Sequence, residues 1–292
     1  MTFESYLAQT KEAVEAILDR HLPTGETFPP RLHQAMRYSV EAGGKRLRPI
    51  LCLAVGELLG GEAKVIEPLA AAIELIHTCS LVLDDLPCMD DGIERRGRPS
   101  LHLTFDESTA LLAGEALLMR AYEIVGQALS ESSLKAREAG EVVQLFGSIL
   151  GSAGMIAGQQ VDLQMVRSRL DVKVMEYRHS RKTGSLFHLA VKAPALLCQA
   201  PIEALNALEI YAKNLGLAFQ IADDLQEKGA SAAESGKSSR RQAPTFVDLC
   251  GESESKALFA QLVQTAEQSL AVFSGRAKRL AELSRYIGQR VT

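Results

Sequence analysis

Two clusters of acidic residues follow apolar stretches of the sequence. The first has four aspartates within residues 81–92 (LVLDDLPCMDDG), namely Asp84, Asp85, Asp90 and Asp91. Unpaired carboxylates are costly to bury, and at the C-terminal end of a helix they also oppose the helix dipole. A divalent cation would relieve both problems, and oxygen ligands without nearby Cys or His clusters favour Mg²⁺, which commonly bridges substrate phosphates. A solvated helix end is the alternative interpretation.

The second cluster lies in residues 219–228 (FQIADDLQEK) and contains Asp223, Asp224 and Glu227. Asp223 and Glu227 are four positions apart, so they share one face of the predicted helix. Taken alone, this pattern fits a solvated helix face equally well. If the two acidic clusters faced each other across a helical bundle, they would form a cavity able to hold several metal ions and a polyphosphate.

Three basic segments could supply further partners for such an anion. The stretch GGKRLRP (43–49) combines two glycines with Lys45, Arg46 and Arg48, and a turn of this kind can bind phosphate through backbone N–H groups and guanidinium groups. An ordinary basic loop is the alternative. The other basic residues are Arg95, Arg96 and Arg98 in ERRGRPSLH (94–102), and Lys182 with Thr183 in RKTG (181–184), which resembles a helix break.

A single histidine, His77, lies on the apolar helix that leads to the first acidic cluster. Such a histidine is usually a satisfied core residue. It stands seven positions before Asp84, which is about two helical turns, so we expect both side chains on the same face of the helix.

Composition narrows the class of protein further. The chain has 292 residues, of which 47% are hydrophobic and 23% charged, with a net charge of −4; this excludes a disordered chain and disfavours a general nucleic-acid binder. The five cysteines are odd in number and show no CxxC spacing, so neither a disulfide framework nor a zinc site is expected. The acidic N-terminus lacks a signal or transit pattern, and the longest apolar run, 65–83, is interrupted by polar residues, so we expect a cytoplasmic protein with no membrane span.

Helical periodicity recurs along the whole chain. Apolar residues fall on helical stripes, for example Leu69, Ile73 and Ile76, and the alternating pattern of strands is missing. We therefore expect an all-α fold of about ten helices, forming a single domain over residues 1–292 around a central cavity. The polar segment 229–244 is either a surface loop or a mobile flap over the site.

Five motifs occur in a fixed order between residues 33 and 228: GGKRLRP, DDxxxxD followed by RRG, GQxxDL, KTG and FQxxDD. In this order they resemble the trans-isoprenyl diphosphate synthases, the polyprenyl synthetase family that makes farnesyl and geranylgeranyl diphosphate. The resemblance implies the all-α isoprenoid synthase fold, a homodimer, and isopentenyl and allylic diphosphates as substrates. It also implies three Mg²⁺ ions that bind the diphosphate of the allylic substrate.

The resemblance assigns roles to individual residues. The implied metal ligands are Asp84, Asp85, Asp90, Asp223, Asp224 and Glu227. Contacts to the allylic diphosphate are implied for Arg95, Lys182, Thr183, Gln220 and Lys237, and contacts to isopentenyl diphosphate for Gly44, Lys45, Arg48, His77 and Arg96. The catalytic set implied by these matches is Asp84, Asp85, Asp90, Arg95, Lys182 and Asp223. Gln159 and Asp162 belong to the GQxxDL element and are expected to support the site.

The implied reaction is a head-to-tail condensation. The metals and cationic side chains stabilise the departing diphosphate, the double bond of isopentenyl diphosphate captures the allylic cation, and a proton is then lost, so no dedicated protein base is needed. Small residues five and four positions before Asp84, Cys79 and Ser80, favour geranylgeranyl over farnesyl diphosphate, because in the family a bulky aromatic residue there stops elongation.

Three departures from the family pattern keep other functions open. Leu83 stands where histidine is common, Glu227 replaces the last aspartate of the second motif, and Ala243 stands where a second lysine would follow Gly236–Lys237. A non-catalytic regulatory subunit, a terpene cyclase and a helical scaffold with surface metal sites are the alternatives. A cyclase would leave Lys45, Arg48 and Arg96 without a second diphosphate to bind.

Overall fold

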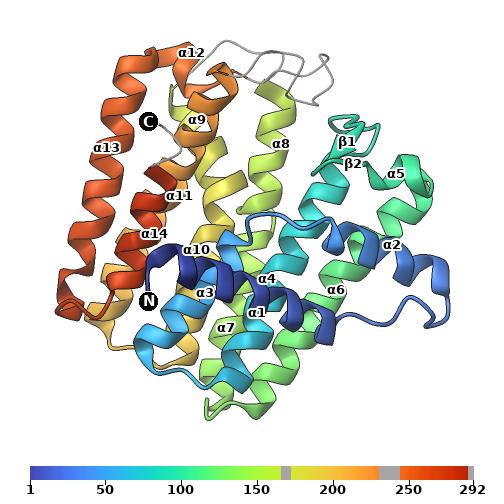
Figure 1. Cartoon of the computed structure of the whole chain (residues 1–292), viewed down its shortest axis with the longest axis horizontal. Coiled ribbons are helices and arrows are strands. Elements are labelled where there is room, and N and C mark those ends of the chain that lie inside the picture. The colour runs from blue at the N-terminus through green and yellow to red at the C-terminus, as the bar shows by residue number, and fades with distance from the viewer. Residues whose placement is uncertain (166–171, 230–243, 289–292) are drawn as a thin grey trace. The chain divides into compact units, whose positions relative to one another are not determined.

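The structure is a computed structural model that describes residues 1–165, 172–229 and 244–288 (Figure 1). The described residues are almost entirely helical, which confirms the predicted all-α class. They form fourteen α-helices where about ten were predicted, and three of these helices have seven residues or fewer. The chain groups into two compact units, whose boundary falls inside helix α3 (Leu47–Leu59).

Unit 1 contains the described residues 1–50 and 63–132. Besides the start of α3, its elements are α1 (Phe3–His21), α2 (Pro30–Glu41), α4 (Ala63–Asp84), the strands β1 (Glu94–Arg95) and β2 (Arg98–Pro99), α5 (Leu101–Thr104) and α6 (Glu107–Glu131).

Helix α4 is the central helix of unit 1 and lies along α6 (Figure 1). The apolar residues Leu69, Ile73 and Ile76 of this helix are fully buried, as the helical stripe predicted. Small residues on α6 permit close packing: a Cβ added at Gly114 would lie 3.2 Å from Leu83 Cδ2. Helix α4 ends at Asp84, so the first acidic cluster begins at the C-terminal end of a buried apolar helix.

Unit 2 contains the remaining described residues. Its elements after α3 are α7 (Ala136–Leu150), α8 (Met155–Met165), α9 (Val172–Arg178), the π-helix η1 (His179–Gly184), α10 (Ser185–Leu197), α11 (Ile202–Gly229), α12 (Phe246–Cys250), α13 (Glu252–Ser269), the 3₁₀-helix η2 (Leu270–Phe273) and α14 (Lys278–Gly288).

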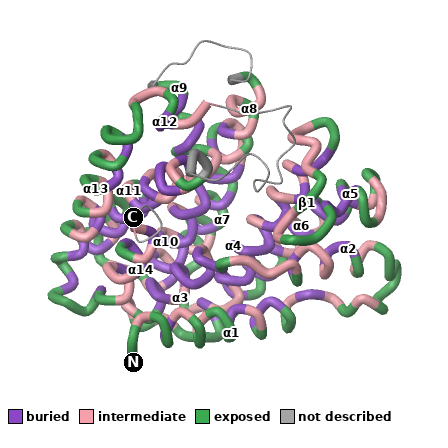
Figure 2. The backbone as a smooth tube through the Cα atoms, turned by 45° about the horizontal axis from the view of Figure 1, so that its top comes forward, coloured by how far each residue is buried: buried purple, intermediate pink, exposed green. Residues whose placement is uncertain are grey.

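Helix α11 is the central helix of unit 2 and packs on α10, α13, α14 and η1. Leu208, Tyr211 and Leu215 form its buried stripe (Figure 2). The hydroxyl of Tyr211 donates to the carbonyl oxygen of Leu280 at 2.7 Å, which satisfies the buried polar atom and ties α11 to α14. Helix α11 thus carries the second acidic cluster on its last turns, as α4 carries the first.

Two helical stretches are long and apolar enough to cross a membrane by length and composition alone, Ala63–Asp84 and Ala136–Gln164. The apolar window of the first is 72% buried inside the protein and that of the second 28%. One or two such helices are weak evidence for a membrane span, because the core helix of a folded domain passes the same test. The expected absence of a span remains a prediction.

Candidate active site

The chain folds back on itself after the last turn of α4. The backbone N–H of Asp90 donates to the carbonyl oxygen of Asp84 at 2.9 Å, and the N–H of Asp91 donates to the carbonyl oxygen of Leu86 at 3.2 Å. These bonds satisfy carbonyl groups that a helix end leaves without partners. They also bring together the backbones of Asp84 and Asp90, which are six positions apart and would lie farther from each other along an unbroken helix.

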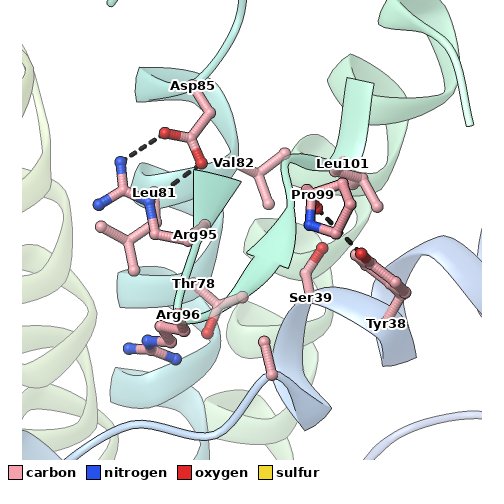
Figure 3. Close-up of a pocket in the computed structure, with 11 residues that line it drawn as sticks. Tyr38, Ser39, Thr78, Leu81, Val82, Asp85, Arg95, Arg96, Pro99 and Leu101 are labelled. Atoms are coloured by element: carbon pink, nitrogen blue, oxygen red, sulfur yellow. Dashed lines mark hydrogen bonds and ion pairs between the residues drawn. The ribbon is translucent and has the colours of Figure 1, made fainter. Parts of the chain in front are cut away.

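Asp85 and Arg95 form a bidentate salt bridge (Figure 3). Arg95 Nε donates to Asp85 Oδ2 at 3.0 Å, and Arg95 Nη2 donates to Asp85 Oδ1. The Asp85 side chain is buried, and burial opposes the charged form of Arg95, but the Asp85 carboxylate outweighs it and raises the arginine pKa. The backbone of Gly92 closes over this carboxylate, because a Cβ there would lie only 2.6 Å from Asp85 Oδ1.

Arg95 and Arg96 belong to a tight hairpin formed by β1 and β2, two strands that the sequence pattern did not reveal. Glu94 pairs with Pro99 and Arg95 with Arg98, which leaves Arg96 and Gly97 as a two-residue turn. Their φ angles are +56° and +76°, and positive φ at both positions is the type I′ arrangement that matches the twist of hairpin strands. Because of this turn, the side chains of Arg95 and Arg96 contact different partners.

Arg96 lies against the glycines of the GGKRLRP segment. Its Nη1 donates to the carbonyl oxygen of Gly43. A Cβ at Gly44 would lie 2.7 Å from Arg96 Cζ, so the Arg96 guanidinium could not stay in place, and the φ of +128° at Gly44 favours glycine. Gly44 is therefore a packing surface for Arg96, a role that the sequence did not predict, while Lys45 next to it is exposed.

His77 acts as a hydrogen-bond acceptor for Arg48. Arg48 Nη1 lies 3.2 Å from His77 Nε2, and an arginine can only donate, so the proton of the imidazole resides on Nδ1. Burial, followed by the charges of Arg48 and Arg96, lowers the pKa of His77 well below its usual 6.5. The histidine is therefore neutral and orients Arg48 instead of contributing a charge of its own.

Arg46 does not belong with the other basic residues of its segment, which corrects the sequence interpretation. Its side chain is fully buried and donates to Glu15 on α1 and Glu74 on α4, at 2.8 and 2.7 Å. The local sequence did not indicate this, because the carboxylates that pair with Arg46 lie 31 and 28 positions away from it in the chain. An acidic residue inside the apolar helix α4, Glu74, was the available signal.

A pocket opens in unit 1 between the hairpin, α2 and α4 (Figure 3). Its polar wall carries Asp85, Arg95 and Arg96, and Tyr38 closes one side by donating its hydroxyl to the carbonyl oxygen of Pro99 at 2.9 Å. The other lining residues are Ser39, Ala42, Thr78, Leu81, Val82, Pro99 and Leu101. The pocket thus joins the arginine pair to an apolar wall of α4.

Cys79 and Ser80 lie on the α4 turn just before the acidic end. Cys79 is buried, and burial followed by the charges of Asp84 and Glu115 raises its pKa to about 12. Ser80 donates its hydroxyl to the carbonyl oxygen of His77 at 2.8 Å. The predicted role of both residues in setting product length remains a prediction.

In unit 2, α8 packs closely against η1. A Cβ at Gly158 would lie 2.2 Å from the backbone nitrogen of Lys182, so glycine is the only residue that permits this contact. Asp162 on the same helix accepts from Lys182 Nζ at 2.7 Å and from Arg178 Nη1 at 3.2 Å. The expected supporting role of Asp162 therefore has a concrete form, the orientation of Lys182. The predicted helix break at RKTG is instead a π-helix, a feature frequent at functional sites.

A chain of hydrogen bonds links η1 to the second acidic cluster. Thr183 Oγ1 donates to Gln220 Oε1 at 2.8 Å, and Gln220 Nε2 donates to Asp224 Oδ1 at 2.8 Å. The backbone N–H of Phe246 donates to Asp224 Oδ2 at 2.9 Å, and the Asp224 side chain is buried. Asp224 thus anchors the start of α12, whereas Asp223 beside it is half-buried.

His179 and Arg178 complete this cluster, and the sequence analysis missed both. Arg178 Nη2 lies 2.8 Å from His179 Nε2, so that nitrogen accepts a hydrogen bond although Asp224 Oδ2 is 3.8 Å away. Burial, followed by the charges of Arg178 and Lys182, lowers the pKa of His179 to about 2. Basic residues around a predicted helix break were the only signal for them.

Some predicted site residues fall outside this description. Lys237 and the flap between residues 230 and 243 lie outside the described residues. Glu227 is part of α11, the same helix as Asp223 and Asp224. Unit 1 brings together Asp85, Arg95 and Arg96, and unit 2 brings together Asp162, Lys182, Thr183, Gln220 and Asp224.

The acidic clusters have the right donor chemistry for Mg²⁺. Each offers carboxylate oxygens, but within residues 1–165, 172–229 and 244–288 no group of three or more His, Cys, Asp or Glu is arranged to hold a metal ion by itself. Mg²⁺ is commonly held by one or two carboxylates together with substrate phosphates and water, not by an all-protein cage. The carboxylates fit an ion that arrives with a polyphosphate substrate.

Comparison with known proteins places the chain in a family. The polyprenyl synthetase family model matches residues 29–274. The chain is 40% identical to a dimethylallyltranstransferase from Fischerella ambigua, over 97% of this chain and 82% of that protein, and 37% identical to a geranylgeranyl diphosphate synthase from Cyanophora paradoxa, over 98% and 96%. It superposes with a TM-score of 0.85 on the apo crystal structure of an FPP/GFPP synthase from Zymomonas mobilis, which is 34% identical and covered over 98% of both chains. The chain therefore belongs to the polyprenyl synthetase family, with the isoprenoid synthase fold, and is a short-chain isoprenyl diphosphate synthase, a prenyltransferase.

Proposed function

We propose that the acidic end of α4 and the acidic end of α11 both act on the diphosphate of an allylic substrate, while Lys45, Arg48 and Arg96 bind the diphosphate of isopentenyl diphosphate. The products are then farnesyl or geranylgeranyl diphosphate, and small Cys79 favours the longer one. The family is generally magnesium-dependent, and we propose that this chain uses Mg²⁺, with three ions when substrate is bound. A cytoplasmic homodimer is the state we propose for it.

The observation that supports this assignment is the contrast between two neighbouring arginines in the β1–β2 turn. Arg95 faces a carboxylate, Asp85, at the end of α4, whereas Arg96 lies on Gly43 and Gly44 beside the basic segment. One diphosphate can therefore bind beside the Asp85–Arg95 pair, where carboxylates and a cation alternate. Another can bind beside Arg96 and the Gly43–Gly44 backbone, where cations and backbone groups predominate. Two diphosphate positions favour a condensing enzyme over a terpene cyclase, which needs one.

The reaction assigned to these groups breaks the allylic C–O bond, with the bonding electrons leaving on diphosphate. Bound Mg²⁺ would supply positive charge to the departing oxygens. Arg95 and Lys182, both fixed by carboxylates, would add charge-assisted hydrogen bonds to the same group. The double bond of isopentenyl diphosphate then forms the new C–C bond, and loss of a proton to the released diphosphate completes the product.

The decisive experiment incubates the purified chain with Mg²⁺, isopentenyl diphosphate and dimethylallyl diphosphate, and identifies the product by mass spectrometry. We expect a prenyl diphosphate longer than the primer. A cyclic or linear hydrocarbon would indicate a cyclase, and recovery of unchanged substrates would indicate a non-catalytic subunit. Repeating the assay with geranyl and farnesyl diphosphate determines the final chain length.

A further inference from the structure

An ion cluster with a buried centre, Arg46 and Glu74, lies next to the basic segment of unit 1. The side chain of Arg46 is 0% exposed and that of Glu74 is 1% exposed. Arg46 donates to both oxygens of Glu15, at 2.8 and 3.0 Å, to Glu74 Oε1 at 2.7 Å, and to the carbonyl oxygen of Val40 at 2.5 Å. Burial opposes the charge on Arg46, but Glu15 and Glu74 offset it and raise the arginine pKa, so the guanidinium stays charged.

Glu74 also faces a second arginine. The same oxygen, Oε1, that accepts from Arg46 lies 3.9 Å from Arg96 Nη2. Arg96 is held on its other side by the carbonyl oxygen of Gly43 and by the surface of Gly44. One buried carboxylate on α4 is therefore shared between an arginine inside the fold and an arginine that lines the pocket.

The two arginines need such support because of their backbone conformations. Arg46 has φ +51° and Arg96 has φ +56°, in the left-handed region that disfavours residues with a Cβ. Such conformations persist only where the surroundings fix them. Glu74 contacts both residues and is the shared negative charge between the two strained turns.

The charges around Arg96 give Glu74 a further effect. Burial lowers the pKa of Arg96; Glu74 raises it, and Arg46 and Arg95 lower it. If the carboxylate were neutral, Arg96 would be repelled by two nearby guanidiniums and would move outward into water. The position of Arg96 on Gly43 and Gly44 thus depends on the charge of Glu74, a group that does not line the pocket.

We propose that Glu74 is a positioning residue for the second diphosphate: through Arg46 and Arg96 it fixes the Gly43–Arg48 segment in the arrangement that receives isopentenyl diphosphate. The inference rests on the proposed function, because it assigns this part of unit 1 to that substrate. Glu74 itself touches no substrate. The Asp85–Arg95 pair at the end of α4 is a separate contact, so binding of the allylic substrate does not depend on Glu74.

The test is substrate-selective kinetics of Glu74→Gln, which keeps the shape of the side chain and removes its charge. We expect the KM for isopentenyl diphosphate to rise on the order of ten-fold, the effect of losing one charge-assisted hydrogen bond. The KM for the allylic substrate should stay within about two-fold, because Arg95 is held by Asp85 and shares no hydrogen-bond partner with Glu74. Glu74→Asp keeps the charge and should recover part of the loss.

The matched control is Glu67→Gln, the same change two turns earlier on α4. Glu67 pairs with Arg20 at 2.6 Å and is 34% exposed, so its loss should leave both KM values unchanged. Calorimetric binding of isopentenyl diphosphate alone gives a readout that does not require turnover, and Glu74→Gln should weaken it by the same factor. Thermal unfolding of each variant separates positioning from loss of the fold.

The outcomes distinguish the inference from the proposed function. If the wild-type chain condenses the two substrates but Glu74→Gln leaves the KM for isopentenyl diphosphate unchanged, or raises both KM values equally together with a lower Tm, the inference is wrong and the function stands. If Glu74→Gln does not fold, an unchanged KM for isopentenyl diphosphate in Glu15→Gln, which loosens Arg46 from the partly exposed side, overturns it instead. If the wild-type chain neither condenses the substrates nor binds isopentenyl diphosphate, the proposed function fails first.

Discussion

The same dipeptide, Asp-Asp, ends the apolar part of a central helix in each unit, but the second aspartate of each pair has different neighbours. In unit 1, Asp85 is matched by the guanidinium of Arg95 from the hairpin. In unit 2, Asp224 accepts from the backbone N–H of Phe246 and the amide of Gln220. One carboxylate pairs with a guanidinium that can also bind phosphate, and the other accepts a backbone N–H and a side-chain amide that tie α11 to α12 and η1.

The two aspartates of each Asp-Asp pair therefore do not have the same surroundings or the same role. The first aspartate of each pair, Asp84 or Asp223, is half-buried, whereas the second is buried. Burial of a carboxylate requires a partner for each oxygen, so the second position of each pair has a structural task in addition to any catalytic one. We therefore expect first-position changes to affect rate and second-position changes to affect stability.

The largest effect is expected from the first positions. Asp84→Ala and Asp223→Ala should each lower turnover on the order of 10³-fold, because each removes stabilisation of the departing diphosphate. Steady-state assays with saturating Mg²⁺ measure the rate, and circular dichroism checks that the helical content is unchanged. Wild-type rates in either variant would contradict the assignment of that residue as a ligand.

Substitutions of Asp85 and Asp224, the second aspartates of the two pairs, should lower the free energy of unfolding by different amounts. Asp85→Asn leaves Arg95 without its charged partner and should lower the free energy of unfolding by about 2 kcal/mol, a value reduced because Arg95 is 38% exposed. Asp224→Asn keeps one oxygen that can accept from Phe246 and should cost about 1 kcal/mol. Urea unfolding measures both. An equal decrease in the free energy of unfolding for the two variants, or a larger decrease for Asp224→Asn, would contradict the difference proposed between Asp85 and Asp224.

The buried histidine of unit 2 predicts a pH dependence. The pKa of His179 is about 2 in the folded protein and about 6.5 when unfolded, so the unfolded state binds more protons between these values. The contribution of His179 to the free energy of unfolding is therefore largely complete above about pH 6.5. It decreases as the pH falls, by about 1 kcal/mol at pH 5.5. His77 in unit 1 shifts in the same direction.

A paired measurement isolates the contribution of His179. The free energy of unfolding of wild type and His179→Asn should be followed from pH 7.5 to 5.5, and the variant should show the shallower slope. Arg178, Lys182 and Asp224 lie around this ring and are present in both proteins, so the difference between the two slopes reports the ring itself. Parallel curves would mean that the pKa of His179 is the same in the folded and unfolded states, which would contradict its burial as a neutral ring.

The smallest effect on rate is expected at the apolar turns behind the acidic end of α4. Cys79→Phe should shorten the product while leaving most of the turnover, because the substituted side chain lies one turn before Asp84, away from the carboxylates themselves. Product chain length from dimethylallyl and farnesyl primers is read by mass spectrometry. Ser130→Ala on the exposed end of α6 is a suitable control, and an unchanged product in Cys79→Phe would contradict the role of this position.

Much of the fold could be predicted because helical periodicity is a local property. The stripes on α4 and α11 predicted buried faces, and both acidic ends were recognised from residue type and spacing. The β1–β2 hairpin was missed because two-residue strands have no periodicity to detect. The π-helix at His179–Gly184 was taken for a break because its basic residues and terminal glycine resemble a helix end.

The directions of the basic side chains could not be predicted. Arg46 and Arg48 are two positions apart and have the same charge, yet one is enclosed by Glu15 and Glu74 and the other donates to His77. Contacts between residues far apart in sequence decide this, and the residue type of the two arginines does not distinguish them; Glu74, an acidic residue within an apolar helix, was the one hint in the sequence. The backbone anchoring by Asp224 likewise depends on Phe246, which lies 22 residues later.

A double-mutant cycle on turnover tests the proposal that the two acidic helix ends act on one diphosphate. Asp84→Asn, Asp223→Asn and the double variant are compared with wild type under saturating substrates. Groups that act as a unit are strongly non-additive, so the double variant should be no slower than the slower single variant. If instead the two losses multiply, the acidic ends act independently and the claim is contradicted.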